Sequence, residues 1–185
     1  MRVLLAVAIL VVALAGCGAE EPRSAALGAA ATKQALAGAP EPLAALHRQQ
    51  GRLLAGGASA FKRRLAELHG YPVVVNKWAS WCGPCRSEFP HFQSQALKRG
   101  KTVAFLGVDS ADNGGDAIAF LRKFPVSYPS YSDPDLKVAA VFKGVGAFPT
   151  TVFYDAAGKL VHMKLGAYPT EAALAADIER YTAHW

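Results

Sequence analysis

The feature that most restricts this sequence is a pair of cysteines, separated by two residues, at the point where a strand gives way to a helix. The apolar sequence Val73-Val74-Val75 opens a predicted β-strand that runs to about Trp78, and residues 83 to about 98 follow the pattern of an α-helix. The junction carries the sequence Trp81-Cys82-Gly83-Pro84-Cys85. A helix N-terminus presents unpaired N–H groups and a partial positive charge, and both stabilise a thiolate. The position of the pair therefore predicts thiol chemistry.

The two cysteines are expected to have different roles in disulfide exchange. Cys82 should be exposed at the helix end and act as the nucleophile that attacks a disulfide. Cys85, one turn later, should be covered and act as the resolving thiol that releases the reduced partner. Pro84 fixes φ near its helical value, and Gly83 keeps the approach to the sulfur open. Trp81 should shield the disulfide and offer apolar contact to partners.

Two structural roles for the pair are weaker alternatives. A tetrahedral zinc site needs four ligands, whereas the chain has three cysteines and no histidine pair at ligand spacing. A structural disulfide between Cys82 and Cys85 would close too small a loop to stabilise the fold much. We therefore predict a redox pair with no metal and no other cofactor.

The pattern from residue 43 onward predicts an α/β domain with a central mixed β-sheet flanked by helices. Val103–Val108 is continuously apolar, as expected of a strand buried on both faces. Further strands are expected at Thr150–Tyr154 and Leu160–Lys164, and helices at Phe61–Leu68, 116–124, 133–142 and 170–181. Four leucines, Leu43, Leu46, Leu53 and Leu54, predict another short helix and hence a helical N-terminal extension.

The first seventeen residues have the pattern of a signal peptide. Arg2 precedes an unbroken apolar run of twelve residues, Val3–Leu14, whereas a spanning helix needs about 20. The run ends in Leu14-Ala15-Gly16-Cys17, which resembles the lipobox of bacterial lipoproteins, where cleavage precedes the cysteine and its thiol is diacylated. A lipidated Cys17 would hold the protein on a membrane. An ordinary secretory signal with an incidental cysteine is the alternative.

Behind this leader the chain divides into a linker and one domain. Residues 18–42 contain 15 Ala, Gly or Pro residues out of 25, which predicts a flexible tether. The whole chain is 52% hydrophobic and 18% charged. This apolar content is enough for residues 43–185 to form the core of a single globular domain. The net charge of +6 is scattered, with no interleaved aromatic residues, so nucleic-acid binding is not expected. We expect the domain to lie outside the cytoplasm, beside a membrane.

Motifs outside the cysteine pair complete a recognisable pattern. Residues 75–85 read Val-Asn-Lys-Trp-Ala-Ser-Trp-Cys-Gly-Pro-Cys, Pro90 follows, and Phe148-Pro149-Thr150-Thr151 precedes a strand. On these motifs, about residues 58 to 184 resemble the thioredoxin superfamily. The closest resemblance is to its membrane-tethered extracytoplasmic branch, the TlpA/ResA-like thiol-disulfide oxidoreductases. The resemblance implies a thioredoxin-like fold and an enzyme that exchanges protein disulfides.

The resemblance also implies where a substrate would bind. Phe148-Pro149 matches the cis-proline position of the family, and cis peptide bonds are nearly confined to X-Pro. In this fold the cis-proline lies against the cysteine pair and leaves the backbone of the preceding residue free to pair with an extended substrate. Phe148, Pro149 and Thr150 are therefore expected to contact the substrate.

Two departures from the thioredoxin pattern bear on proton transfer. Asn76 replaces the buried Asp of thioredoxins proper, and Asn is common at this position in the tethered branch. Glu88, one turn after Cys85, is then expected to accept a proton from this thiol and to raise the pKa of both thiols. A solvated acid in the first helical turn is the alternative. Asp112 is a second candidate, and Lys77 should point to the opposite sheet face as a surface charge.

The expected function is disulfide reduction, with electrons from a membrane donor passed to extracytoplasmic protein disulfides. In related proteins the substrates include apocytochrome c thiols, and the Gly-Pro pair between the cysteines is shared with reducing thioredoxins. A disulfide oxidase or isomerase for secreted proteins, with an electron acceptor in place of the donor, would use the same residues. A thiol peroxidase is a weaker alternative, since Val75 and Ala79 stand where peroxiredoxins carry Pro and Thr.

Overall fold

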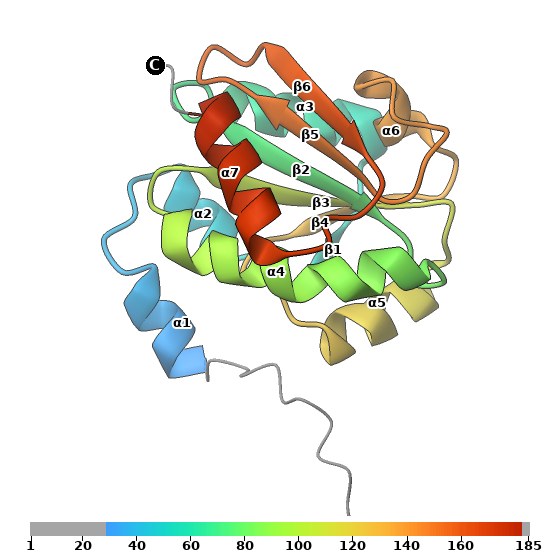
Figure 1. Cartoon of the computed structure of the whole chain (residues 1–185), viewed down its shortest axis with the longest axis horizontal. Helices are drawn as coiled ribbons and strands as arrows, with labels where there is room; N and C mark the ends of the chain where they lie inside the picture. The colour runs from blue at the N-terminus through green and yellow to red at the C-terminus, as the bar shows by residue number, and fades with distance from the viewer. Residues whose placement is uncertain (1–28, 183–185) are drawn as a thin grey trace, which may run out of the picture.

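The computed structural model describes residues 29–182, which form a six-stranded sheet with helices on both faces (Figure 1). The predicted signal peptide and Cys17 lie outside these residues. In chain order the elements are α1 (Ala29–Ala35), α2 (Leu43–His47), β1 (Leu53–Leu54), α3 (Gly57–Glu67), β2 (Val73–Trp78), α4 (Gly83–Arg99), β3 (Ala104–Ser110), α5 (Gly114–Lys123), β4 (Ser130–Asp133), α6 (Lys137–Val141), β5 (Thr150–Tyr154), β6 (Leu160–Leu165) and α7 (Glu171–Thr182).

The sheet is mixed, and the strand that leads to the cysteine pair is central in it. The strand order is β1-β4-β3-β2-β5-β6. Strands β1, β4, β3 and β2 run parallel, whereas β5 pairs antiparallel with both β2 and β6. Every residue of β2 and β3 is buried, which accounts for the apolar runs at residues 73–75 and 104–108. The prediction of a mixed sheet flanked by helices is confirmed.

Alternation along β2 sends neighbouring side chains into two separate cores. Val74 and Trp78 pack with side chains of α4, α5 and α7. Val73 and Val75 pack on the other face, with side chains of α2, α3 and α6. In Figure 1, α4 and α7 accordingly cover one side of the sheet, and α3 and α6 the other. Each residue of β2 therefore acts on one face only.

Trp78 is the largest side chain of the first core, and its polar atom is satisfied there. Its ring lies 5.2 Å from that of Phe89 and 4.9 Å from that of Phe120. The indole Nε1 donates a hydrogen bond of 3.2 Å to Ser130 Oγ on β4. The two atoms meet over Gly107 of β3, where a Cβ would lie 2.1 Å from Ser130 Oγ. Glycine is thus required at position 107 for this contact.

The predicted helix through Leu53 and Leu54 is wrong beyond His47. These two leucines form β1, which pairs with Ser130 and Tyr131 of β4. A leucine pair carries no period that separates a helix from a strand. The unpaired backbone groups of β4 favour the strand, because an uncovered edge needs hydrogen-bond partners.

The predicted helix start at Asp133 is also wrong. Ser130–Asp133 is a strand, β4, and α6 begins only at Lys137. The Asp133 carboxylate still caps that helix, because it accepts hydrogen bonds from the backbone N–H of Val138 (2.7 Å) and Ala139 (2.9 Å). It also accepts one from Ser110 Oγ at 2.8 Å. Asp133-Pro134 therefore looks like a helix start in the sequence, although Asp133 ends a strand and caps a helix that begins only at Lys137.

Part of the segment that composition assigns to a flexible tether is described by the structure, as residues 29–42. Helix α1 lies here, and the side chain of Leu36 is 6% exposed. Leu36 approaches Gly100 at the end of α4 so closely that a Cβ on Gly100 would lie 2.8 Å from it. His47 Nε2 also lies 2.9 Å from the Gly100 carbonyl oxygen. Composition does not reveal these contacts with the end of α4.

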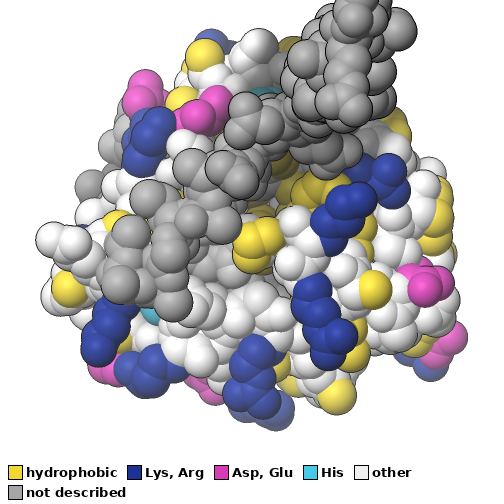
Figure 2. All heavy atoms as spheres, turned by 90° about the horizontal axis from the view of Figure 1, so that it is seen from below, with side chains coloured by type: hydrophobic (Ala, Val, Ile, Leu, Met, Phe, Trp, Pro, Cys, Tyr) yellow, Lys and Arg dark blue, Asp and Glu magenta, His cyan; other side chains and the backbone are white. Residues whose placement is uncertain are grey.

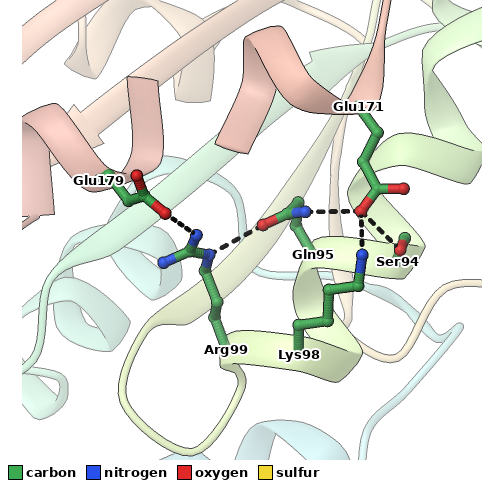
Figure 3. Close-up of polar contacts among 6 residues, drawn as sticks. All are labelled: Ser94, Gln95, Lys98, Arg99, Glu171 and Glu179. Atoms are coloured by element: carbon green, nitrogen blue, oxygen red, sulfur yellow. Dashed lines mark hydrogen bonds and ion pairs between the residues drawn. The ribbon is translucent and has the colours of Figure 1, made fainter. Parts of the chain in front are cut away.

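A polar network fixes α7 across α4, as Figure 3 shows. Glu171 at the start of α7 accepts hydrogen bonds from three side chains of α4, and Arg99 of α4 bonds to a second acid of α7. The donors to Glu171 are Ser94, Gln95 and Lys98, and the partner of Arg99 is Glu179. Gln95 also accepts from Arg99 at 2.8 Å. The helix that carries the cysteines is thereby held at its far end.

The surface over α4 and α5 combines basic, neutral and apolar side chains. Figure 2, which views the molecule from this side, shows Lys and Arg side chains spread among neutral and apolar groups. Within residues 29–182, no helix combines the length and the hydropathy needed to span a bilayer.

Candidate active site

The cysteine pair opens α4, at the carboxyl end of the central strand. Cys82 is the N-cap of the helix, with extended backbone, and Pro84 stands in the first turn. Cys82 and Cys85 form a disulfide, with their Cα atoms 5.3 Å apart. The backbone N–H of Cys85 donates to Cys82 Sγ at 3.1 Å. One of the free N–H groups of the helix start therefore points at the sulfur of Cys82, where it would stabilise a thiolate.

Both sulfurs are covered in this disulfide form. Cys85 is fully buried, as expected, but Cys82 is only 4% exposed, whereas exposure was predicted. The reason is local, since Cys82 Sγ turns into the first turn of α4 and bonds there to Cys85. Trp81, in contrast, is 59% exposed, and its Nε1 donates to the Ala111 carbonyl at 3.0 Å. Its ring lies 4.9 Å from the ring of the partly buried Phe148, so two aromatic side chains adjoin at this end of the sheet.

Glu88 lies in the core, not on the surface as the alternative interpretation required. Its side chain has no exposed area. Asn76 Nδ2 donates to Glu88 Oε1 at 2.7 Å, and the backbone N–H of Tyr168 donates to Oε2 at 3.0 Å. Burial raises the pKa of Glu88 to about 7, since these two hydrogen bonds and the charge of Lys164 offset only part of it. The structure thus places Asn76 and Glu88 together, one helical turn from Cys85.

The predicted substrate residues form the entry to β5. The Phe148–Pro149 peptide bond is cis. Thr150 Oγ1 donates to the Ala147 carbonyl at 2.8 Å, and the Pro149 carbonyl accepts from Gly166 N–H at 2.9 Å. Among residues 29–182, neither the N–H nor the C=O of Phe148 has a hydrogen-bond partner. This backbone is available to an incoming chain, beside the exposed Trp81.

Two aspartates stand at the carboxyl end of β3. Asp112 accepts hydrogen bonds from the backbone N–H groups of Ser80 and Asn113, so it fixes the segment that leads to Cys82. Asp109 is 1% exposed, and neither of its oxygens has a hydrogen-bond partner in the described part of the chain. Burial, followed by the charge of Asp112, raises the pKa of Asp109 to about 8. Sequence reasoning missed Asp109, although an acid that ends a continuously apolar strand was a visible signal.

Lys77 points away from Asn76, as alternation predicts, but it is not a surface charge. Its side chain is fully buried, and Nζ donates to the Gly144 carbonyl at 2.6 Å. Nζ also lies 3.7 Å from the centroid of the Phe148 ring. Burial lowers the pKa of Lys77 to about 8, partly offset by the charge of Asp133. The loop before β5 covers this lysine, and no periodicity in the sequence indicates that a loop would lie over it.

Comparison with known proteins agrees with this geometry. A sequence model of the redoxin family matches residues 58–179. The chain belongs to the redoxin family. The redoxin match covers the segment from α3 into α7, and thus both the cysteine pair and the cis-proline. The resemblance to the thioredoxin superfamily and its TlpA/ResA-like branch is confirmed.

Individual relatives support the same assignment of this redoxin. It is 28% identical over 107 residues to "Thiol-disulfide oxidoreductase ResA" of Oceanobacillus iheyensis, which covers 56% of this chain and 54% of that protein. It is 35% identical over 111 residues to "Thiol:disulfide interchange protein DsbE" of Allochromatium vinosum, covering 60% and 59%. The chain thus spans less than two thirds of the length of these relatives.

A solved structure shows the same fold. The crystal structure of a putative thiol:disulfide interchange protein DsbE from Chlorobium tepidum is 33% identical to this redoxin, with a TM-score of 0.57. The similarity covers 63% of this chain and 84% of that one. The two proteins therefore share a fold over most of the length of the Chlorobium tepidum protein.

Proposed function

We propose that this redoxin is an extracytoplasmic thiol-disulfide oxidoreductase that reduces protein disulfides. The observation that carries the proposal is the Cys82–Cys85 disulfide at the N-terminus of α4, joined by contact between Trp81 and Phe148 to a cis-proline loop with a free backbone. The names of the relatives from Oceanobacillus iheyensis and Allochromatium vinosum describe the same chemistry.

Reduction would proceed by two successive exchanges. The Cys82 thiolate attacks one sulfur of the substrate disulfide, and the other substrate sulfur leaves as a thiolate that takes up a proton. Cys85, after losing its proton, attacks Cys82 Sγ and breaks the mixed disulfide. The second substrate sulfur leaves and is protonated in turn, and the Cys82–Cys85 disulfide forms. Two electrons have passed to the substrate, and a dithiol of a membrane donor protein must restore them.

Glu88 is the base that we assign to Cys85. Residues three apart on a helix are neighbours, with about 5–6 Å between their Cβ atoms. A carboxyl group whose pKa burial raises to about 7 holds and releases a proton near neutral pH. Asp112 is bound to the backbone ahead of Cys82, so we assign it a positioning role.

Two features outside the geometry support the direction and the location. The Gly83-Pro84 pair between the cysteines favours a reductase, because reducing thioredoxins share it. The apolar run Val3–Leu14 supports export, and the Cys17 motif after it supports attachment to the membrane through a lipid on that cysteine.

The reduction potential of the Cys82/Cys85 couple tests the direction of electron flow. We would equilibrate a soluble form that begins after Cys17 in glutathione buffers and count free thiols. A value near or below about −250 mV indicates a reductase. A value between about −120 and −180 mV would instead indicate an oxidase or isomerase. The absence of a titrating disulfide would contradict any oxidoreductase function.

The roles of the two cysteines are tested by their serine variants. Cys82→Ser should abolish reduction of insulin disulfides, whereas Cys85→Ser should accumulate mixed disulfides with protein substrates. Insulin reduction that survives in Cys82→Ser would refute its role as nucleophile. Cys17→Ser should release the full-length protein from the membrane fraction, and continued attachment would show another anchor.

A further inference from the structure

The buried lysine of the central strand has no place in the exchange chemistry, yet it contacts the residue expected to meet the substrate. We propose that Lys77 is a positioning residue for substrate binding, which holds the loop of residues 144–148 and sets the place of the Phe148 ring. The inference rests on the proposed function, because it assigns a determinant of affinity for protein substrates.

The strand register brings Lys77 directly beside the cis-proline loop. Lys77 lies opposite Thr150 in the antiparallel pair of β2 and β5. Thr150 is the residue that follows Pro149. A side chain from position 77 on the face away from α4 therefore extends beneath the loop that precedes β5. Its ammonium reaches Gly144 at one end of that loop and Phe148 at the other.

The loop is tied at two carbonyl oxygens, and Lys77 supplies one of the ties. Lys77 Nζ binds the carbonyl of Gly144, and Thr150 Oγ1 binds that of Ala147. Gly144 is itself packed so closely that a Cβ would lie 2.4 Å from the ring of Phe142. Phe148 follows directly after Ala147, and its ring contacts Lys77 itself. Loss of the ammonium would therefore remove both the tie at Gly144 and a contact of the ring.

The ring of Phe148 connects the buried charge with the exposed active-site surface. A cation within about 6 Å of an aromatic ring is attracted by its electrons, and Lys77 Nζ lies 3.7 Å from the centroid. The same ring contacts Trp81, the exposed neighbour of Cys82. Lys77 therefore acts from the interior on an aromatic surface that a substrate would meet from outside.

The position of Lys77 separates it from proton transfer. Asn76 and Glu88 lie on the face of β2 covered by α4, whereas Lys77 lies on the other face. Lys77→Met keeps the length of the side chain and removes the ammonium, and burial of an uncharged stem carries no desolvation cost. The variant should thus fold, bind substrate more weakly and leave sulfur chemistry unchanged.

Single-turnover kinetics of the pre-reduced full-length protein test this. Its oxidation is followed, by alkylation of free thiols, against insulin and against hydroxyethyl disulfide, which is too small to need the loop. For Lys77→Met the half-saturating insulin concentration should rise about tenfold, or about 1.4 kcal/mol. The limiting rate, the rate with hydroxyethyl disulfide and the reduction potential should stay at wild-type values.

Matched variants separate the contact from net charge and from general damage. Lys143→Met removes the same charge from an exposed residue directly before the loop and should behave as wild type. Phe148→Leu should raise the half-saturating insulin concentration, and adding Lys77→Met to it should have no further effect. Lys77→Leu replaces Lys77→Met if the latter lacks the wild-type circular dichroism spectrum.

Three results would overturn the inference. They are equal losses with insulin and hydroxyethyl disulfide, a shifted reduction potential, and additivity of Lys77→Met with Phe148→Leu. A wild-type protein that oxidises with neither disulfide would refute the proposed function itself, and this outcome is distinct from all three.

Discussion

The carboxyl group of Glu88 should make the oxidised protein less stable as the pH rises. Burial raises its pKa from an ordinary value of 4.5 to about 7 in the folded protein. Between these two values the folded protein keeps a proton that the unfolded chain has released. The free energy of unfolding therefore falls with increasing pH over this interval, and the loss is complete above the folded pKa.

The size of the effect follows from the two pKa values. The full difference between 4.5 and about 7 corresponds to about 3.4 kcal/mol, of which about 2.5 kcal/mol is lost between pH 5 and pH 8. Glu88→Gln removes this titration and fits the same site. The Gln oxygen accepts from Tyr168 N–H, and its amide donates to Asn76 Oδ1, which lacks a partner in the described structure, once the Asn76 amide turns over.

Urea unfolding of the oxidised protein at pH 5 and pH 8 measures this directly. Wild type should lose about 2.5 kcal/mol more of its unfolding free energy than Glu88→Gln over this interval. Titration of Asp109 contributes equally to both proteins and cancels in the difference. Equal pH dependence in the two proteins would refute the argument, because it would mean that Asn76 and the Tyr168 N–H fully offset the burial of the charge.

Three further substitutions test the packing that holds the site. Gly107→Ala forces a Cβ against Ser130 Oγ and should cost about 2–3 kcal/mol of unfolding free energy; an unchanged melting temperature would show that β3 and β4 separate freely. Asp133→Asn places an amide against three donors, should cost about 2 kcal/mol in urea unfolding, and is contradicted by wild-type stability. Leu36→Ala should cost about 2 kcal/mol if residues 29–42 belong to the domain, and no change in the melting temperature would assign them to a tether.

The central part of the fold could be predicted because its signals are long and redundant. Strands β2 and β3 are buried on both faces, and each contains an apolar run, residues 73–75 and 104–108. The edge of the sheet offers no such signal. Strand β4 reads Ser-Tyr-Ser-Asp, and Asp133-Pro134 matches the start of a helix. Its neighbour β1 has two residues, and its pairing depends on β4 being present.

The candidate site divides in the same way. Cys82, Cys85, Asn76 and Glu88 lie on one strand and the helix that follows it. Their proximity could be predicted because it depends only on these two elements and on the spacing of the residues. The burial of Lys77 depends on the loop before β5, which is far away in the sequence and has no regular pattern. Alternation predicted the face on which Lys77 lies but not the cover on that face. The surroundings of Asp109 were not predicted for a related reason, because they come from β2 and β4 on either side of its own strand.

Adjacent residues of β2 thus connect the cysteine pair with two different environments. Asn76 turns toward α4 and holds the acid near Cys85, while Lys77 turns toward the loop that carries Phe148. A central strand is the element best able to do this, because its backbone is fixed by partners on both sides and its side chains alternate between faces. Both environments adjoin the segment that follows the strand, because Trp81 contacts Phe148 and Cys82 bonds to Cys85. With the roles proposed for Glu88 and Lys77, proton transfer and substrate affinity would therefore vary independently, since each depends on contacts that the other does not share.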